Sequence, residues 1–384
     1  MKVFHFYSGN RLGGVEVLLV TLQKLRGEFD GGAMEPFFGL CWDGALASRL
    51  REAGARLRVI RPASFARPWT VFRSRADLRE ALLAEKPDLV VCHEFWNYAL
   101  AAPVVRKIRL PLVVWHHSPP RGYWLELFVR FYKPDLAIAC SRYVALKLRS
   151  LEKEDRIRYC YAPIPAPESP RSDARERVRR DVGVRADEVV VCFVGRLSAY
   201  KGQRQLLDAV ALLKDLPLRT WITAPVQSRE DSEFLASLKA QCKASGIEHS
   251  VRFFEHFESA QDLYVGADIY CQPNASPEPF GFTFVEALYA GLPVVSTEIG
   301  GALEILRGDA SDGGTQDFGV LVPPQDVESL AHALRVLICD ASQRERFRAK
   351  GAKRALEISN PAVVMPKLAS LLNEAIQYHR GATL

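Results

Sequence analysis

The sequence predicts an α/β fold made of two doubly wound parallel-sheet domains in tandem. Three observations lead to this prediction. Short apolar runs alternate with longer helical patterns along the chain, which is typical of a parallel sheet covered by helices on both faces. A proline cluster interrupts the alternation near residue 165, and the same pattern starts again at residue 189.

The first half of the chain is expected to form one domain, residues 1–165. Its predicted strands are residues 3–8, 37–41, 57–60, 89–93, 112–116 and 136–140. Its predicted helices are residues 15–26, 45–53, 76–84, 99–107 and 143–151. Four prolines then fall within residues 163–170. A segment with so few N–H donors cannot join the interior of a sheet, so the domain boundary is placed there.

The second half is expected to form another domain, residues 166–365, followed by a C-terminal helix, residues 366–384, that returns to the first domain. Its predicted strands are residues 189–194, 220–223, 251–254, 268–271, 294–296 and 319–322. Its predicted helices are residues 171–180, 203–213, 232–245 and 284–290. Two such domains in tandem are expected to have a cleft between them. Ligands of open α/β sheets bind at the carboxyl ends of the strands.

The composition excludes several classes of protein. Of 384 residues, 48% are hydrophobic and 25% are charged, as in ordinary globular proteins. The eight cysteines include no C-x-x-C pair, which fits reduced thiols and makes a zinc or disulfide scaffold improbable. No apolar run approaches the ~18 residues of a membrane span, and the N-terminus has no signal-peptide pattern. A cytoplasmic protein is expected, at most peripheral at the inner face of the membrane.

Charge is divided unevenly between the two halves. Residues 1–165 carry 26 Lys and Arg against 16 Asp and Glu, whereas the remainder carries 25 against 29. A basic first half fits contact with an anionic membrane or a phosphorylated substrate, or simply a solvated basic face. No nucleic-acid motif accompanies these charges, so nucleic acid is not an expected partner.

The most informative motif is the stretch from Glu278 to Glu286. It places two carboxylates around a glycine turn between an apolar strand and an apolar helix. Free N–H groups at such a helix N-terminus bind anions, phosphate above all. Carboxylates on either side can accept hydrogen bonds from vicinal hydroxyls of a sugar or ribose. Phosphate and hydroxyls together indicate a nucleotide sugar.

A second motif follows the first strand of the second domain. Arg196 and Lys201 lie in the segment that runs from Gly195 to Gly202. Two cations there can hold a diphosphate and stabilise it as a leaving group. The alternative is a pair of solvated surface cations, and the motif at Glu278 favours the functional interpretation.

Two weaker signals lie in the first domain. Gly13-Gly14 precedes the first helix and allows close approach to an anion. His116 and His117 end one strand and His93 ends the preceding one. Side chains alternate along a strand, so at most one of His116 and His117 is expected to face the crevice.

The segment 121–133 is basic and aromatic. It fits either a core helix with charged ends, which is the preferred interpretation, or a segment that lies on a membrane interface.

With these motifs in their order, the chain resembles the retaining GT-B glycosyltransferases of family 4, also called group 1. Gly13–Glu16, the strand-end histidine, Gly195–Gly202 and Glu278–Glu286 carry the resemblance, together with Ala290–Val295 and Ser296–Ile305. It implies an N-terminal acceptor domain, a C-terminal nucleotide-sugar domain, and chemistry that needs no metal and no cofactor.

The resemblance also implies a role for each site residue. Arg196 and Lys201 would hold the donor diphosphate, Glu286 the ribose, and Glu278 the transferred sugar. Backbone contacts to sugar and phosphate would come from Phe280, Gly281, Phe282 and Thr283, Gly14 would approach the phosphates, and His117 would be the active-site histidine, with His116 as a one-residue alternative. The donor is expected to be a UDP-sugar, with GDP- and ADP-sugars as alternatives, and the acceptor a saccharide or lipid-linked hydroxyl in bacterial polysaccharide, lipopolysaccharide or glycolipid synthesis.

Two departures leave the nucleobase open. Ala162-Pro163 stands where the family often has Asn-Gly, and Glu255-His256 stands where it often has a glycine. A nucleotide-sugar epimerase, a phosphorylase that carries pyridoxal phosphate, and a non-catalytic nucleotide-sugar-binding subunit remain alternatives.

Overall fold

The structure is a computed structural model that divides into two compact units. Unit 1 comprises Met1–Ile164 and Ser359–Leu384, and unit 2 comprises Pro165–Ile358. The described residues are 1–9, 13–29, 32–167, 173–256, 259–307 and 317–381. The chain rejoins unit 1 at Ser359, seven residues earlier than the return predicted at residue 366.

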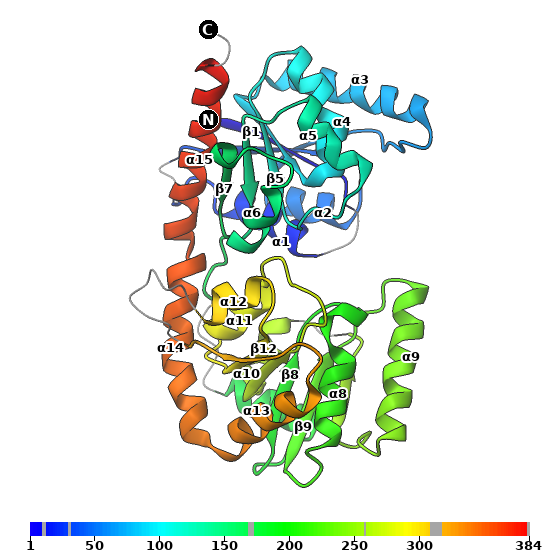
Figure 1. Cartoon of the computed structure of the whole chain (residues 1–384), viewed down its shortest axis with the longest axis vertical. Coiled ribbons are helices and arrows are strands. Elements are labelled where there is room, and N and C mark those ends of the chain that lie inside the picture. The colour runs from blue at the N-terminus through cyan, green and yellow to red at the C-terminus, as the bar shows by residue number, and fades with distance from the viewer. Residues whose placement is uncertain (10–12, 30–31, 168–172, 257–258, 308–316, 382–384) are drawn as a thin grey trace. The chain divides into compact units, whose positions relative to one another are not determined.

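Unit 1 is built on a seven-stranded sheet in which every neighbouring pair is parallel. The strand order is β3-β2-β1-β4-β5-β6-β7, and β1, β5 and β7 of this sheet are labelled in Figure 1. The strands are β1 (Lys2–Tyr7), β2 (Glu35–Leu40), β3 (Arg56–Val59), β4 (Leu89–His93), β5 (Leu112–His116), β6 (Leu136–Ala139) and β7 (Ile157–Tyr159). The two central strands β4 and β5 are completely buried, as their uninterrupted apolar sequences predict.

The helices of unit 1 are α1 (Gly14–Lys24), α2 (Ala45–Glu52), α3 (Pro68–Glu85), α4 (Glu94–Lys107), η1 (Trp124–Leu127), α5 (Phe128–Phe131), α6 (Arg142–Leu148), η2 (Glu154–Arg156) and α15 (Pro361–Gly381). Helix α15 packs against β5 and β6. An ion pair between Arg158 and Glu374 at 2.6 Å also joins it to β7. These contacts attach the C-terminal helix to unit 1 (Figure 1).

The segment 121–133 is not the core helix that was the preferred prediction. It forms only the 3-10 turn η1 and the single turn α5, and several of its aromatic side chains are exposed. The buried Glu126 carboxylate accepts hydrogen bonds from the N–H groups of Arg121 and Gly122 at 2.6 and 2.9 Å. A local turn therefore takes the place of the predicted helix.

Unit 2 contains a six-stranded parallel sheet of order β10-β9-β8-β11-β12-β13. Its strands are β8 (Val189–Phe193), β9 (Leu218–Thr223), β10 (Val251–Phe254), β11 (Ile269–Gln272), β12 (Val294–Thr297) and β13 (Val320–Val322). Its helices are α7 (Ala174–Val182), η3 (Ala199–Lys201), α8 (Gln203–Ala211), α9 (Arg229–Ala244), α10 (Ala260–Gly266), α11 (Phe282–Tyr289), α12 (Gly301–Leu306), α13 (Val327–Cys339) and α14 (Ala341–Ser359). The prediction of two parallel-sheet α/β domains is confirmed.

Each sheet has one point where the strand order reverses. In unit 1 it lies between β1 and β4, and in unit 2 between β8 and β11. Loops that leave the carboxyl ends of two such strands turn to opposite faces and open a crevice, where α/β proteins bind their ligands. The topology therefore predicts that ligands bind at the loops after Phe193 and Gln272 in unit 2, and at those after Tyr7 and His93 in unit 1.

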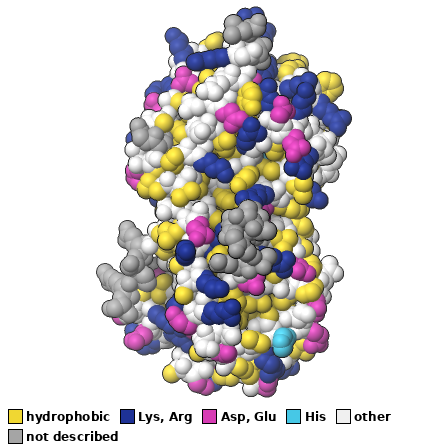
Figure 2. All heavy atoms as spheres, turned by 60° about the vertical axis from the view of Figure 1, so that its left-hand side comes forward, with side chains coloured by type: hydrophobic (Ala, Val, Ile, Leu, Met, Phe, Trp, Pro, Cys, Tyr) yellow, Lys and Arg dark blue, Asp and Glu magenta, His cyan; other side chains and the backbone are white. Residues whose placement is uncertain are grey.

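The surface shows no single basic field on the face drawn in Figure 2. There, Lys and Arg side chains are scattered among hydrophobic and acidic ones. No described helix combines the length and apolarity needed to cross a membrane.

Candidate active site

In unit 2, the loops after β8 and β11 come into direct contact at the reversal point. The N–H of Ala275 donates to the carbonyl of Tyr200 at 2.8 Å. Gly202 has a φ of +89°, and a Cβ added there would lie 1.9 Å from the carbonyl oxygen of Pro273. A glycine is thus required for Lys201 to lie against the loop that carries Glu278.

Lys201 and Glu278 form an ion pair between these two loops. Their side chains are only 12% and 13% exposed, so the pair is largely removed from water and each charge depends on the other. The predicted phosphate-binding cation and the predicted sugar-binding carboxylate are therefore adjacent.

A buried polar network around Gln272 contacts the ion pair through Glu278. The Gln272 side chain, fully buried, accepts hydrogen bonds from Tyr270 Oη at 2.8 Å and Thr283 Oγ1 at 3.1 Å. Its Nε2 donates to Asn274 Oδ1 at 2.9 Å and to Glu278 Oε2 at 3.4 Å. All four hydrogen-bonding positions of the amide are used, which fixes its orientation and helps to hold Glu278. Sequence reasoning missed Gln272 and Asn274, although a polar residue that ends an apolar strand is a usable signal.

Helix α11 begins directly after this network. Its N-cap Gly281 has a φ of +110°, and the N–H groups of Phe282 and Thr283 have no hydrogen-bond partner among the described residues. They belong to the first turn, where the helix leaves its N–H donors free and the helix dipole favours an anion. Phe280 is buried just before the turn. This turn therefore presents free N–H groups at a helix N-terminus, and phosphate binding there stays a prediction.

Glu286 lies in the middle of α11, where its carboxylate accepts a hydrogen bond from Tyr264 Oη at 3.0 Å. Burial raises its pKa to about 7, and the Tyr264 hydrogen bond partly opposes this shift. A carboxylate with a single donor in a poorly solvated position can accept further hydroxyl groups. Tyr264 is a third residue that the sequence did not indicate.

Arg196 is exposed in the loop after β8, and only its carbonyl takes part in a described hydrogen bond, from Gln203 Nε2 at 2.9 Å. Within the described residues its guanidinium forms no ion pair. This cation is unpaired in the described chain, whereas Lys201 is paired with Glu278 in the free protein.

In unit 1, the middle of β1 and the ends of β4 and β5 bring three histidines into a hydrogen-bonded row. His5 Nδ1 lies 3.1 Å from His93 Nε2, and His93 Nδ1 lies 2.9 Å from His117 Nε2. Burial lowers the pKa of His5 and of His117 to about 3, and that of His93 well below its usual value. All three rings are therefore neutral, and the tautomer of His93 determines which nitrogen of His117 carries the proton.

Glu94 follows His93 at the end of β4, and its side chain binds the backbone just after the end of the neighbouring strand β5. It has a left-handed φ of +71°. Its carboxylate accepts the N–H of His117 at 2.9 Å and the hydroxyl of Ser118 at 3.1 Å. Burial raises its pKa to about 7. A strained non-glycine residue at a strand end is a feature of functional sites, and neither Glu94 nor His5 was predicted.

The two neighbouring histidines of β5 have different surroundings. His116 is fully buried beside the ring of Phe95, at 4.3 Å between centroids, and neither of its ring nitrogens has a hydrogen-bond partner among the described residues. His117 is half-buried on the side of His93. Gly14 begins α1 and is exposed, whereas Asn10–Leu12 of the same turn lie outside the described residues.

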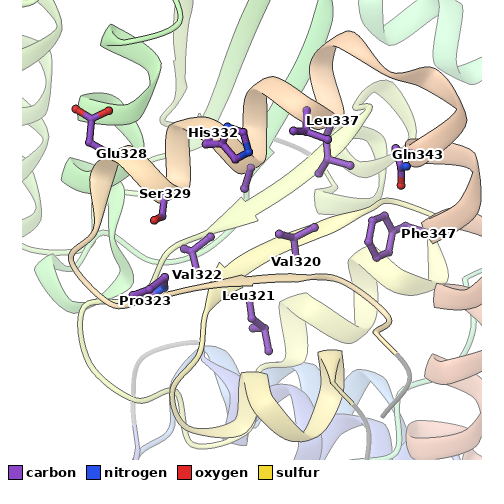
Figure 3. Close-up of a pocket in the computed structure, with 12 residues that line it drawn as sticks. Val320, Leu321, Val322, Pro323, Glu328, Ser329, His332, Leu337, Gln343 and Phe347 are labelled. Atoms are coloured by element: carbon purple, nitrogen blue, oxygen red, sulfur yellow. The ribbon is translucent and has the colours of Figure 1, made fainter. Parts of the chain in front are cut away.

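A separate hollow in unit 2 contains none of the predicted site residues. Figure 3 shows it between β13 and α13, lined mainly by apolar side chains, with His332 and Glu328 on α13. Its lining contains no Lys or Arg, in contrast to the loops after β8 and β11. No group of three or more potential metal ligands occurs in the described parts of the chain.

Comparison with known proteins defines the class of this site. Residues 13–166 match the model of Glycosyltransferase Family 4 and residues 174–354 that of Glycosyl transferases group 1. Together the two models cover most of the chain. The protein belongs to these glycosyltransferases, and its two parallel-sheet units have the GT-B fold.

Individual relatives agree with this family. An uncharacterized glycosyltransferase of Methanocaldococcus jannaschii is 26% identical over 315 residues, or 76% of this chain and 77% of that protein. D-inositol 3-phosphate glycosyltransferase of Corynebacterium urealyticum is 36% identical over 177 residues, which cover 44% of this chain and only 40% of that protein. The crystal structure of Anabaena HepE in complex with UDP and glucose matches with a TM-score of 0.84 at 21% identity, over 97% of this chain and 99% of that one.

Proposed function

We propose that the protein transfers a sugar from a nucleoside diphosphate to a hydroxyl group of an acceptor, with retention at the anomeric carbon and without a metal. The observation that carries this proposal is the Lys201–Glu278 ion pair beside the free N-terminus of α11. It combines a cation, a carboxylate and free N–H donors at one reversal point of a parallel sheet.

In this proposal the donor lies across the loops after β8 and β11. Its diphosphate forms ion pairs with Arg196 and Lys201 and accepts hydrogen bonds from the N–H groups at the start of α11. The sugar hydroxyls donate hydrogen bonds to the Glu278 carboxylate, and the ribose hydroxyls donate to the Glu286 carboxylate. The Lys201–Glu278 pair then keeps each group in place until the ligand provides a partner for both.

Bond cleavage would leave the diphosphate with an additional negative charge. Lys201 and Arg196 stabilise that charge, which is the largest contribution that fixed cations can make to such a reaction. The acceptor oxygen forms its bond to the anomeric carbon on the face that the phosphate leaves. Its proton passes to the departing phosphate oxygen, which balances the transfer without a protein base. His117, held neutral by burial, is proposed to contact the sugar as a hydrogen-bonding group.

We also propose which classes of donor and acceptor the protein uses. UDP-sugars are the first to test, because the HepE structure contains UDP and glucose. The acceptor is proposed to be a saccharide or a lipid-linked hydroxyl, as in the synthesis of bacterial polysaccharide, lipopolysaccharide or glycolipid. The basic charge of residues 1–165 fits a phosphorylated acceptor.

A thermal-shift screen against UDP-, GDP- and ADP-sugars tests the donor. A ligand at ~100-fold excess over its dissociation constant stabilises the fold by about 2.7 kcal/mol, and we expect one nucleotide class to do so. Slow hydrolysis of that donor would exclude a non-catalytic subunit, and a changed sugar without acceptor would indicate an epimerase. No stabilisation by any nucleotide sugar would overturn the proposal.

A further inference from the structure

Two segments of unit 1 expose an unusual number of large aromatic side chains. Trp69 and Phe72 at the start of α3 are 59% and 70% exposed, and Phe131 at the end of α5 is 80% exposed. Tyr123 and Trp124 of the turn before α5 are 60% and 56% exposed. We call these five residues the aromatic surface. Their exposure is unfavourable in water, so a surface of this kind marks a site of interaction.

The two segments are neighbours in space. The ring of Phe65, just before α3, lies edge-on to Trp124 with 5.3 Å between centroids, and 6.2 Å from Phe128. It also contacts Trp96 of α4 at 5.8 Å. Helix α4 packs against both α3 and the η1–α5 turn. Phe65 thus joins the start of α3 to the η1–α5 turn.

The exposed charges of both segments are all positive. They belong to Arg67, Arg73, Arg121, Arg130 and Lys133, whereas the exposed Arg61 is paired with Asp77 of α3 at 2.5 Å. Residues 61–73 contain no acidic residue, and residues 121–133 contain only Glu126. Glu126 is 3% exposed, because it accepts two backbone hydrogen bonds inside the turn. The sole carboxylate is therefore turned away from the surface.

We propose that the aromatic surface binds the headgroup region of an anionic lipid bilayer as a peripheral contact. Tryptophan and tyrosine combine an apolar ring with a polar group and favour that region, exposed phenylalanines add apolar area, and exposed arginines beside them complement lipid phosphates. The core of a protein–protein interface is instead depleted of charge, whereas here each segment has an arginine next to an exposed aromatic residue, Arg73 after Phe72 and Arg130 before Phe131. The contact would bring unit 1 to acceptors that are carried in a membrane, and it is independent of the donor site in unit 2.

Vesicle flotation tests the proposal without any assay of activity. We expect the protein to float with vesicles of phosphatidylcholine mixed with phosphatidylglycerol, and to remain unbound with phosphatidylcholine alone. Binding should weaken about tenfold when salt rises to roughly 0.5 M, because the screening length then becomes shorter than the distances between the charges. Brominated lipids should quench tryptophan fluorescence in the bound state.

Variants assign the binding to these side chains. Replacing Trp69, Phe72 and Phe131 together by serine removes only exposed groups and should lower vesicle binding about tenfold. Leu146→Ser, at a site 57% exposed on α6 of the same unit, is the matched control and should bind as the unchanged protein does. Melting temperatures of both variants establish that they are folded.

Three results would overturn the proposal. One is no flotation on phosphatidylglycerol vesicles at low salt. Another is equal binding by the triple variant. The third is a dimer in light scattering that the triple variant abolishes without any vesicle binding, which would assign the aromatic surface to a second copy of the chain.

Discussion

Lys201 and Glu278 hold opposite charges next to each other in a place that is largely screened from water. Removing one charge leaves the other without its partner, which costs more than the pair itself contributes. The free protein and the proposed complex therefore use the same two side chains in different ways.

The first prediction is a double-mutant cycle on this pair. Lys201→Ala and Glu278→Ala should each abolish turnover, and each should lower the free energy of unfolding by about 1–3 kcal/mol. The double variant should lose less stability than the sum of the two, since no charge is left unpaired. Urea denaturation measures this, with Lys239→Ala on an exposed pair as control. Additive losses, or full activity in either single variant, would contradict the assignment.

The second prediction concerns the pH dependence of donor binding through Glu286. Burial raises its pKa to about 7, and ribose hydroxyls that donate to the carboxylate would favour the ionised form. Binding should therefore release protons near neutral pH and tighten about ninefold between pH 6 and pH 8, as the ionised fraction rises from roughly a tenth to nine tenths.

Calorimetry in buffers of different ionisation enthalpy detects the released protons. Glu286→Gln should bind more weakly and without this pH dependence. An unchanged pH profile in that variant would exclude Glu286 as a ligand of the donor.

The third prediction separates the two adjacent histidines of β5. His117→Ala should lose turnover. His116→Phe should retain it, because the His116 ring lies beside Phe95 and neither of its ring nitrogens is hydrogen-bonded within the described chain. Initial rates and melting temperatures of both variants measure this. Loss of activity in His116→Phe alone, with the fold intact, would reverse the assignment.

Within that row of rings, His93 and Glu94 act on His117 from the end of β4. One contacts its ring and the other its backbone N–H. They are positioning residues for His117, since each acts on it through a hydrogen bond.

At the scale of elements, the candidate site depends on how closely the loops after β8 and β11 approach. Gly202 allows this approach, because any side chain there would overlap the carbonyl of Pro273. The same glycine is the N-cap of α8. One residue thus sets the start of a helix and the position of Lys201.

The fourth prediction compares two glycine replacements. Gly202→Ala and Gly246→Ala both place alanine at a positive φ, but nothing lies closer than 3.8 Å to a Cβ at Gly246. Gly246→Ala should lose about 1 kcal/mol through backbone strain alone. Gly202→Ala should lose clearly more, and should weaken donor binding as well. Equal losses of stability and unchanged donor affinity would show that the loop contact is not needed.

At the scale of the whole molecule, the two units differ in their buried ionisable groups. Unit 1 contains four histidines whose pKa values are lowered by loss of solvation, namely the buried His5, His93 and His116 and the half-buried His117. The histidines of unit 2, His249, His256 and His332, are all exposed. Below pH 6.5 the unfolded chain binds protons at these rings and the folded chain does not, so acid destabilises unit 1.

The fifth prediction follows from that difference. Lowering the pH from 7 to 5 should reduce hydrogen-exchange protection of β1, β4 and β5 far more than that of β8 and β11. Each buried histidine contributes up to about 1.4 kcal/mol per pH unit. Glu94 and Glu152, whose pKa values burial raises to about 7 and 8, act in the opposite direction and reduce the net effect. Equal loss of protection in both units, after correction for intrinsic exchange, would contradict this account.

Much of the architecture could be predicted because it depends on local patterns. Buried parallel strands have continuous apolar sequences, as in Leu89–His93, and prolines mark the passage between the units. The turn at 121–133 could not be predicted, since its apolar residues fit a core helix until Glu126 is seen to bind the backbone instead.

Candidate site residues could be selected where a motif indicates the chemistry, but the contacts that join distant segments could not be foreseen. Lys201 and Glu278 were selected separately, but nothing in the sequence shows that they form one ion pair. Gln272 and Glu94 stabilise the site through hydrogen bonds to residues 6 to 24 positions away. Such partners are fixed by the fold and leave no local pattern.

The central claim is that a nucleotide sugar binds unit 2 with its diphosphate at Lys201, Arg196 and the start of α11. A crystal structure with a non-transferable UDP-sugar analogue tests it most directly. We expect phosphate oxygens within hydrogen-bond distance of Lys201 and of the Phe282 and Thr283 N–H groups. The ribose hydroxyls should donate hydrogen bonds to Glu286. Ligand density elsewhere, for example in the hollow between β13 and α13, would contradict it.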